Sequence, residues 1–167
     1  MKMLKSIVLI SAIGTAISAH AEGQPSVRME PSNLQGPRQL QEQTARAAIR
    51  DYLDSWATLS NALQQNRPDL LDRDFVGAAR DKLANTIKAQ NATGIRSIYH
   101  DRSHDVQILF YSPEGLSIEL ADTVEYDVQV LDHDKSIGTE QVHIRYIVVL
   151  TPTETRWRVR IFQSQAE

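Results

Sequence analysis

The chain has 167 residues, with 18 lysines and arginines against 21 aspartates and glutamates, and it contains no cysteine. A formal net charge of −3 without a long basic run argues against nucleic acid as a partner. The missing cysteines exclude thiol catalysis and cysteine-ligated metals, and a chain of this length can bury a core without disulfides.

Residues 1–21 have the pattern of a secretory signal peptide. Lys2 and Lys5 form a basic start, an apolar run follows, and Ala19-His20-Ala21 supplies the small-x-small pattern that suits signal peptidase. No apolar stretch approaches the roughly 18–20 residues that a membrane helix needs. We therefore expect no membrane span, cleavage near Ala21, and a secreted protein, in a bacterial host a periplasmic one. Loss of the two lysines takes the net charge from −3 to about −5.

Residues 22–38 carry three prolines and two glycines among polar residues, which predicts a flexible linker. A single domain is then expected over residues 39–167. It opens with apolar residues spaced three and four apart up to Gln65, the pattern of an amphipathic helix. The residues on this face are Ile49, Tyr52, Leu53, Trp56, Leu59 and Leu63.

Pro68 marks the boundary between two helices. Proline disfavours a helical residue before it and is well suited to the first turn of a helix, so we expect the first helix to end near Asn66 and a second to begin at Pro68. The apolar stripe of the second helix comprises Leu71, Phe75, Ala79, Leu83 and Ile87. Residues 91–94 are expected to end it.

Beyond Gly94 the apolar period changes to two, which predicts strands. The inward sets are Val106, Ile108 and Phe110; Ile118, Leu120, Val124, Tyr126, Val128 and Val130; Val142, Ile144, Tyr146, Val148 and Leu150; and Trp157, Val159 and Ile161. Turn residues separate them at 113–115, 132–136 and 152–155. The fold class is therefore α+β, with N-terminal amphipathic helices packed on an antiparallel meander of about four strands.

This layout resembles the nuclear transport factor 2-like superfamily, including its SnoaL-like branch, over about residues 39–163. The most specific part of the resemblance is the ending, where the strand Tyr146-Ile147-Val148-Val149-Leu150 is followed by a short turn and Arg156-Trp157-Arg158-Val159. Chloroplast-division and mitochondrial-import members end in a similar way. The resemblance implies a strongly curved sheet that forms a cone around the first helix. The superfamily holds enzymes, binding modules and assembly domains, so it does not decide the function.

Asp122 is the candidate catalytic residue. By strand parity it lies with Leu120 and Val124 on the face that otherwise forms the core. A buried carboxylate in a curved sheet can line a pocket, where burial raises its pKa and lets it act as acid or base. The alternative is a β-bulge near Ala121 that turns the side chain to water.

The segment His100-Asp101-Arg102-Ser103-His104-Asp105 repeats a His-Asp pair four residues apart. Such a spacing converges on one metal only in a helix, whereas this segment is expected to be a polar loop before a strand. We therefore predict no metal site and no cofactor. The superfamily's enzymes often pair an aspartate with a histidine, but nothing in the sequence indicates that His100 or His104 reaches the cone.

Two further sets of residues are candidates, one for lining a pocket and one for forming an interface. The expected pocket lining is aromatic and consists of Tyr52, Trp56, Tyr126, Tyr146 and Trp157. The outward face of the sheet offers an interface for a second copy or another periplasmic protein through Arg145, Ile147, Val149, Arg158, Arg160 and Phe162. On this face we expect Glu125 opposite Arg145 and Asp127 opposite His143. The alternative for the aromatic set is that it packs as ordinary core. The alternative for the outer face is a solvated surface with cross-strand pairs of charged side chains.

The sequence thus favours an exported, non-enzymatic binding or interaction domain. It would hold a small apolar ligand in the cone or a protein on the sheet face. The rival hypothesis is a SnoaL-like isomerase, cyclase or hydrolase in which Asp122 is the acid or base and Tyr126 or Tyr146 donates a hydrogen bond.

Overall fold

A computed structural model describes residues 23–32, 34 and 38–165, so the expected signal peptide lies outside the described residues. The helices are α1 (Glu42–Gln65), the short 3-10 helix η1 (Pro68–Arg73) and α2 (Gly77–Ala92). The strands are β1 (Ser26–Met29), β2 (Ile95–Tyr111), β3 (Ile118–Asp132), β4 (Lys135–Pro152) and β5 (Trp157–Gln165). They form one sheet in the order β1-β2-β3-β4-β5. The predicted α+β class is confirmed, with five strands rather than four.

The fifth strand lies where a linker was expected. β1 pairs in parallel with β2, with Ser26 beside Ser103 and Met29 beside Val106, whereas all other neighbouring strands are antiparallel. The prediction of a flexible linker is therefore wrong for residues 26–29. Four residues are too few for a clear period-two pattern, which explains why composition misled the prediction.

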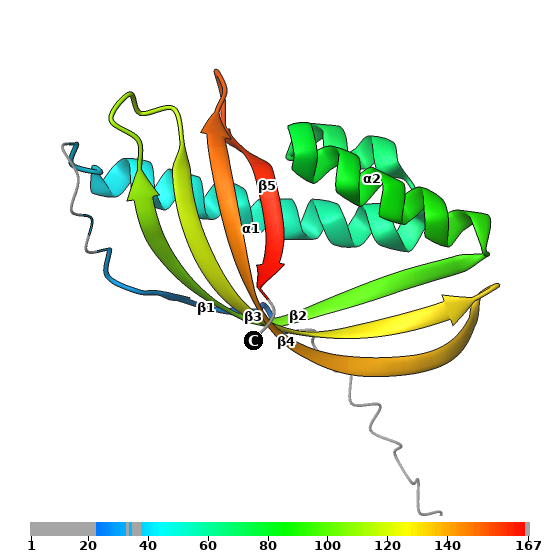
Figure 1. The fold of residues 1–167 in the computed structure, drawn as a ribbon. Coiled ribbons are helices and arrows are strands. Elements are labelled where there is room, and N and C mark those ends of the chain that lie inside the picture. Colours follow the sequence, from blue (N-terminus) through cyan, green and yellow to red (C-terminus); the bar gives the residue numbers. More distant parts are fainter. Residues whose placement is uncertain (1–22, 33, 35–37, 166–167) are drawn as a thin grey trace, which may run out of the picture.

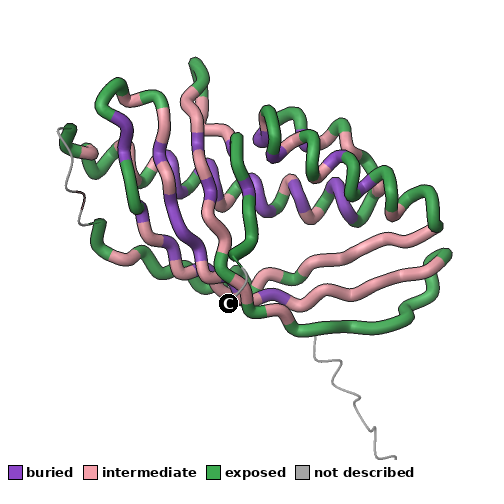
Figure 2. The backbone as a smooth tube through the Cα atoms, in the orientation of Figure 1, coloured by how far each residue is buried: buried purple, intermediate pink, exposed green. Residues whose placement is uncertain are grey.

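The sheet curves around α1, and α2 lies over β5 (Figure 1), with Gln90 near the end of α2 donating to the Leu63 carbonyl of α1. Buried positions gather where α1 faces the strands, while the outer surfaces of both helices are exposed (Figure 2). Tyr52, Trp56 and Leu59 of α1 are almost fully buried, as the helical spacing predicted. No helix in the described part of the chain is long and apolar enough to cross a membrane.

The expected second helix is interrupted. η1 ends at Arg73, and Phe75 then forms a bridge to Val159 before α2 begins at Gly77. The Val76 N–H donates to the Val159 carbonyl at 2.9 Å, and the Val159 N–H donates to the Asp74 carbonyl at 2.8 Å. These bonds hold the chain extended beside β5, so a tertiary contact overrides the local helical pattern. Leu71, Phe75, Ala79 and Ile87 are nevertheless buried, as predicted.

Four bulges set which residues face the concave side of the sheet. The register shifts by one residue at Arg102 and Leu109 in β2, at Ile137 in β4 and at Arg160 in β5. Each bulge reverses the alternation of side chains beyond it.

The bulge at Arg160 corrects two predictions. Val149 lies opposite Ile161 and Leu150 opposite Val159, so beyond Arg160 the parity is reversed. Ile161 is 39% exposed and Phe162 only 9%. Phe162 therefore belongs to the core and not to the outer face, and Ile161 takes the outward place.

The register between β3 and β4 also differs from the expected ion pairs. Glu125 lies opposite His143, and Asp127 lies opposite Gln141. The hairpin turns on His133 and Asp134 alone, which both have positive φ, and this tight turn together with the bulge at Ile137 sets the register two residues away from the expected one. Asp127 is bound instead by Arg102, with 2.6 Å between Nη2 and Oδ2.

Candidate functional site

Asp122 lies in the first half of β3 on the concave face and is fully buried. In the described sheet, Asp122 pairs in regular register with Val106 on one side and Tyr146 on the other. The alternative in which a bulge turns this side chain to water is therefore wrong. The alternation of side chains along the predicted strand was sufficient to predict that Asp122 faces the core.

Two side chains from other elements meet the Asp122 carboxylate. The Tyr52 hydroxyl of α1 donates to Asp122 Oδ2 at 2.7 Å, and His104 Nδ1 of β2 lies 2.7 Å from the same oxygen. Tyr52 is fully buried and His104 is 2% exposed. Helix and sheet thus converge on a single carboxylate oxygen at the centre of the domain.

His104 is the functional candidate that sequence reasoning missed. The expected loop over residues 100–105 is part of β2, and His104 alternates with Val106 and Ile108 on the buried face. The same parity argument that placed Val106 and Ile108 inward could have found it. Within the described residues, no group of three or more histidine, cysteine, aspartate or glutamate side chains is placed to hold a metal ion.

The bulge at Arg102 brings a second carboxylate to His104. Asp101 lies opposite Tyr126 and Ser103 opposite Glu125, so Arg102 is the extra residue. Asp101 and His104 therefore face the same side although they are three residues apart. Asp101 Oδ2 lies 3.9 Å from His104 Nε2, and the Asp101 side chain is 18% exposed.

The imidazole of His104 is thus held between Asp122 on Nδ1 and Asp101 on Nε2. Burial by itself lowers the pKa of His104, but hydrogen bonding and charge interactions with the two carboxylates outweigh it and raise the pKa to about 9. The raised pKa favours the imidazolium form at neutral pH, in which Nδ1–H donates to Asp122 and Nε2–H faces Asp101 at 3.9 Å.

Aromatic rings surround this centre. Trp56 contacts His104 with 5.2 Å between ring centroids, and it also contacts Tyr126 at 5.9 Å and Tyr146 at 5.6 Å. Tyr99 stacks on Tyr126 at 5.0 Å. Burial raises the pKa of Tyr52 and Tyr126 well above the ordinary value and that of Tyr99 to about 12, so these phenols stay neutral. Four of the five predicted pocket residues, Tyr52, Trp56, Tyr126 and Tyr146, therefore gather here.

Three buried polar atoms of this centre lack a hydrogen-bond partner among the described residues. They are Asp122 Oδ1, Asp101 Oδ1 and Trp56 Nε1. Buried polar atoms in native proteins are nearly always paired, with protein, water or a ligand. Asp122 Oδ1 and Asp101 Oδ1 therefore have unused acceptor capacity, whereas a hydrogen bond from Trp56 acts on the Tyr52 hydroxyl and lowers its pKa.

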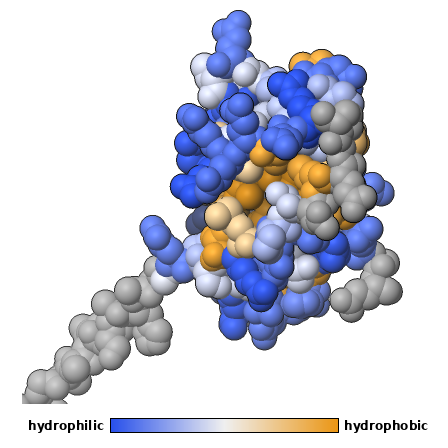
Figure 3. Space-filling model, turned by 90° about the vertical axis from the view of Figure 1, so that its left-hand side faces the viewer, coloured by the Kyte–Doolittle hydropathy of each residue, from blue (hydrophilic) through white to orange (hydrophobic). Residues whose placement is uncertain are grey.

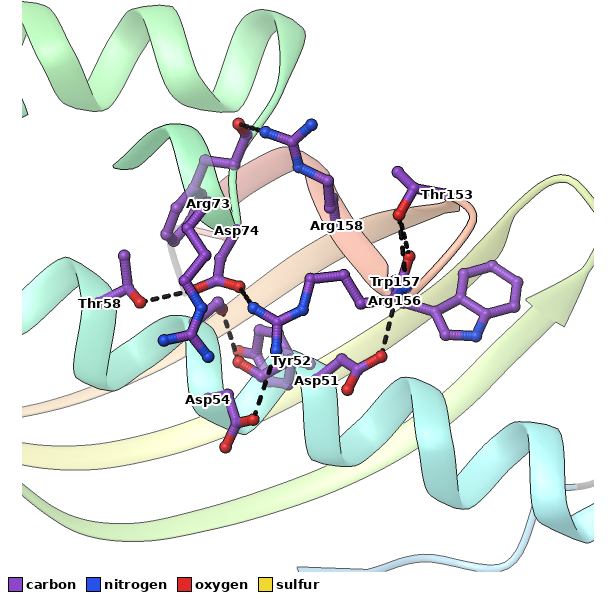
Figure 4. Close-up of polar contacts among 12 residues, drawn as sticks. Asp51, Tyr52, Asp54, Thr58, Arg73, Asp74, Thr153, Arg156, Trp157 and Arg158 are labelled. Carbon is purple, nitrogen blue, oxygen red and sulfur yellow. Dashed lines mark hydrogen bonds and ion pairs between the residues drawn. The ribbon is translucent and has the colours of Figure 1, made fainter. Parts of the chain in front are cut away.

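Trp157, the fifth predicted pocket residue, lies elsewhere. It begins β5, where its backbone N–H donates to Asp51 Oδ2 at 2.9 Å. In Figure 4 its ring points away from a neighbouring ion-pair network of Asp74, Arg156 and Asp54. This network ties α1, η1 and β5 together and includes the Thr58 hydroxyl, which donates to Asp74.

Three of the six predicted interface residues lie on the outer face of the sheet, namely Arg145, which is exposed, and Ile147 and Val149, which are half-buried. Arg160 is exposed, but it is the bulged residue of β5 and its side-chain stem lies beside Gly77 at the start of α2. Arg158 is turned to the edge of the sheet, where it donates to the backbone carbonyls of Asp72 and Phe75.

Exposed apolar side chains extend this face, namely Leu109, Phe110 and Ile161. The predicted inward places of Phe110 and Ile161 are wrong, because the bulges at Leu109 and Arg160 reverse the alternation. A hollow of about 490 Å³ lies among Leu109, Glu119, Arg145, Ile147 and residues 163–165.

A second hollow, of about 440 Å³, lies at the edge of β2 beside the buried centre. Its lining comprises Gly23, Gln24, Pro25, Tyr99, His100, Asp101 and Arg102. Tyr99 and Asp101 belong both to this hollow and to the surroundings of His104. Figure 3 shows the end of the molecule at which β1 and the start of α1 lie. On this end a band of apolar side chains lies between hydrophilic ones.

No protein-family model and no curated protein matches the sequence. Several solved structures match the fold. The intermembrane space region of the chloroplast protein ARC6 is 12% identical, with a TM-score of 0.61, over 78% of this chain and 100% of that one. The Kfla4162 protein of Kribbella flavida is 10% identical, with a TM-score of 0.50, over 73% of this chain and 93% of that one.

A candidate scytalone dehydratase from Novosphingobium aromaticivorans is 17% identical, with a TM-score of 0.49, over 73% of this chain and 84% of that one. Identities this low establish the fold and nothing finer. The curved sheet wrapped around an N-terminal helix is that of the nuclear transport factor 2-like superfamily, and this chain has that fold.

Proposed function

We propose that the protein is an exported, non-enzymatic binding protein that holds a small, mainly apolar molecule between α1 and the concave face of the sheet. The polar group of that molecule would meet Asp122, His104 and Trp56, and its apolar part would contact Tyr126 and Tyr146. The observation that carries the proposal is the buried charged centre around Asp122, whose carboxylate has an unpartnered oxygen and lies among the aromatic side chains of the core.

Stability alone does not account for such a centre. Charged groups taken out of water cost free energy that their mutual attraction offsets only in part, and well-packed apolar residues usually do as well or better. Sites where a protein departs from the rules of stable packing are commonly its functional sites. The cost of burying Asp122 therefore supports a role for this residue in binding a ligand.

The test is a nuclear magnetic resonance titration with 2-naphthol, a ring compound whose hydroxyl both donates and accepts. We expect saturable shifts of the Trp56 indole N–H and the His104 ring, and their loss in Asp122→Asn. Asp105→Asn is the matched control, because Asp105 lies on the same strand as His104 but on the opposite face. Shifts confined to exposed side chains would contradict the proposal.

Acid–base catalysis is the second candidate, and the position of His104 between two carboxylates favours it. An imidazolium can donate a proton while Asp122 accepts one, which suits proton transfer next to a carbonyl. Tyr126 or Tyr146 would donate a hydrogen bond to the carbonyl oxygen. Deuterium incorporation into 2-tetralone in D₂O measures this step. The candidate predicts faster exchange than in buffer and loss of the acceleration in His104→Gln, whereas equal rates would refute it.

The outer face supports a separate interaction role, in which a second copy or another protein covers Leu109, Ile147, Val149 and Ile161. Apolar side chains flanked by arginines are common at such interfaces. Gel filtration with light scattering tests self-association. A dimer that Ile147→Asp converts to a monomer would support the role, and a monomeric mass at high concentration would refute a homodimer.

Export itself rests on the sequence of residues 1–21. Mass spectrometry of the protein recovered from the periplasm or the medium should give a chain that begins near residue 22. A full-length chain confined to the cytoplasm would contradict export.

A further inference from the structure

We infer that a second copy of this chain pairs with the free edge of β4, so that two sheets join into one through an antiparallel β4–β4 contact centred on Gln141. The free edge is the side of residues 135–144 that faces away from β3. This contact differs from one on the outer face of the sheet, and it needs no ligand between α1 and the sheet.

The free edge exists because β5 covers only part of β4. Their register ends with Arg145 opposite Gln165, and in the described chain no strand lies beside residues 135–144 on the side away from β3. This part of β4 is the outermost strand at the lower right of Figure 1. Backbone N–H and C=O groups along such an edge are unpaired, and an extended polypeptide strand is the partner that can bond them in series.

The tip of this edge is protected against pairing, whereas its middle is open. The bulge at Ile137 interrupts the register next to the hairpin, and the exposed Lys135 adds a charge there. Bulges and lysines are common means by which proteins prevent edge-to-edge pairing. From Gly138 to Ile144, β4 keeps a regular register with β3 and has neither lysine nor proline. A second strand can therefore pair with this stretch.

Symmetry limits how a second copy can lie there. A two-fold axis that passes through the sheet keeps the concave sides of both copies together, and side chains alternate along a strand. One residue of β4 must then lie opposite its own counterpart. Gln141 is the centre of the open stretch and takes this place, which sets Gly138 opposite Ile144 of the second copy.

The neighbouring registers are less favourable. Glu140 on the axis would set two carboxylates directly opposite each other, and like charges in that position destabilise a sheet. Val142 on the axis would set Thr139 of the second copy opposite Arg145, where Gln165 already pairs. The register centred on Gln141 avoids both conflicts.

The side chains in this register are complementary. A Cβ atom at Gly138 would have no neighbour within 4 Å, so the space beside this glycine is open, and Ile144 of the second copy would fill it. The half-buried Val142 would lie diagonally across from its own counterpart on the concave side. On the outer side, Thr139 would lie opposite His143. Apolar contacts thus fall on the concave side and polar contacts on the outer side.

Site-directed cross-linking tests the register, because the chain has no cysteine of its own. Opposed Cα atoms of an antiparallel pair are ~4.5–5.5 Å apart, within reach of a disulfide, so Gln141→Cys should give a covalent dimer under mild oxidation. Lys135→Cys is the matched control, since it is also exposed on this edge but its two copies would be more than ~30 Å apart. Equal yields from the two variants, or no dimer from either, would overturn the inference.

Sedimentation equilibrium distinguishes this contact from one on the outer face. Gln141→Lys sets two ammonium groups opposite each other, so it should be a monomer at concentrations at which the wild type dimerises. Because residue 141 is exposed, the thermal unfolding of this variant should match that of the wild type. Ile147→Asp changes the outer face and should keep the dimer. A dimer that Ile147→Asp dissociates and Gln141→Lys does not would contradict the inference and favour the outer face.

Discussion

Asp74 and Asp122 are the two fully buried aspartates of the described chain, and their surroundings differ. Asp74 lies near the end of η1, where Arg156 binds Oδ1 and the Thr58 hydroxyl binds Oδ2 (Figure 4). Its charge is balanced by a guanidinium, and both oxygens have partners. Asp122 shares one oxygen between Tyr52 and His104, and its other oxygen has no partner among the described residues.

From this difference we expect Asp74 to have a structural role and Asp122 a functional one. The Asp74 network joins α1, the end of η1 and the start of β5. Removing its charge should therefore weaken the fold. The Asp122 centre leaves hydrogen-bonding capacity unused, which a protein selected for stability alone would fill. Removing its charge should therefore affect binding more than folding.

The largest expected effect is that of Asp74→Asn on stability. The change leaves Arg156, whose side chain is 20% exposed, without its buried anionic partner. Loss of one member of a buried pair usually costs several kcal/mol, and we expect about 3 kcal/mol from urea unfolding. Asp72→Asn is the control, because Asp72 pairs with Arg80 at the surface, and it should have no measurable effect. Equal stabilities of the two variants would refute the structural role of Asp74.

The next effect is a pH dependence that belongs to Asp122 and its partners. His104 has its pKa raised to about 9 in the folded protein, above the ordinary value of 6.5. The stabilisation that it provides is complete below about pH 6.5 and is lost as the pH rises through 9. Urea unfolding between pH 6 and 9.5 should show this decline, and His104→Gln should flatten it. A decline that persists in His104→Gln but disappears in a variant of the exposed His143 would show that His143, and not His104, is the titrating group.

The smallest effects compare the hydroxyl donors of the two aspartates. Tyr52→Phe removes one of two donors to Asp122 and should cost about 2 kcal/mol, because hydrogen bonds to buried charged groups are the stronger ones. Thr58→Val removes a donor to Asp74 but leaves Arg156 in place, so about 1 kcal/mol is expected. A larger loss in Thr58→Val than in Tyr52→Phe would contradict this ranking.

Strand and helix periodicity predicted much of this structure. The face of α1, the inward sets of β3 and β4, and the turns between strands follow from period alone, because one side of each element is buried. The same reasoning placed Asp122 inward and could have placed His104 there. His104 was missed because residues 100–105 were expected to form a loop. Polar residues such as Asp101 and Arg102 interrupt the apolar alternation that would have predicted a strand there.

Bulges and tertiary contacts account for what the sequence did not predict. Asp101 reaches His104 only because Arg102 is an extra residue in β2, and Phe162 faces the core only because Arg160 is one in β5. Phe75 leaves the helical pattern to pair with Val159. No local residue pattern in this sequence marks those positions, because each depends on the strand lying alongside.

The most direct test of the account is to measure both the stability and the ligand response of Asp122→Asn. We predict a smaller loss of unfolding free energy than in Asp74→Asn, because the asparagine carbonyl still accepts from Tyr52 and Asp101 still faces His104. We also predict that 2-naphthol no longer shifts the Trp56 indole N–H. A variant that loses as much stability as Asp74→Asn yet keeps the wild-type response to 2-naphthol would show that Asp122 is a structural residue.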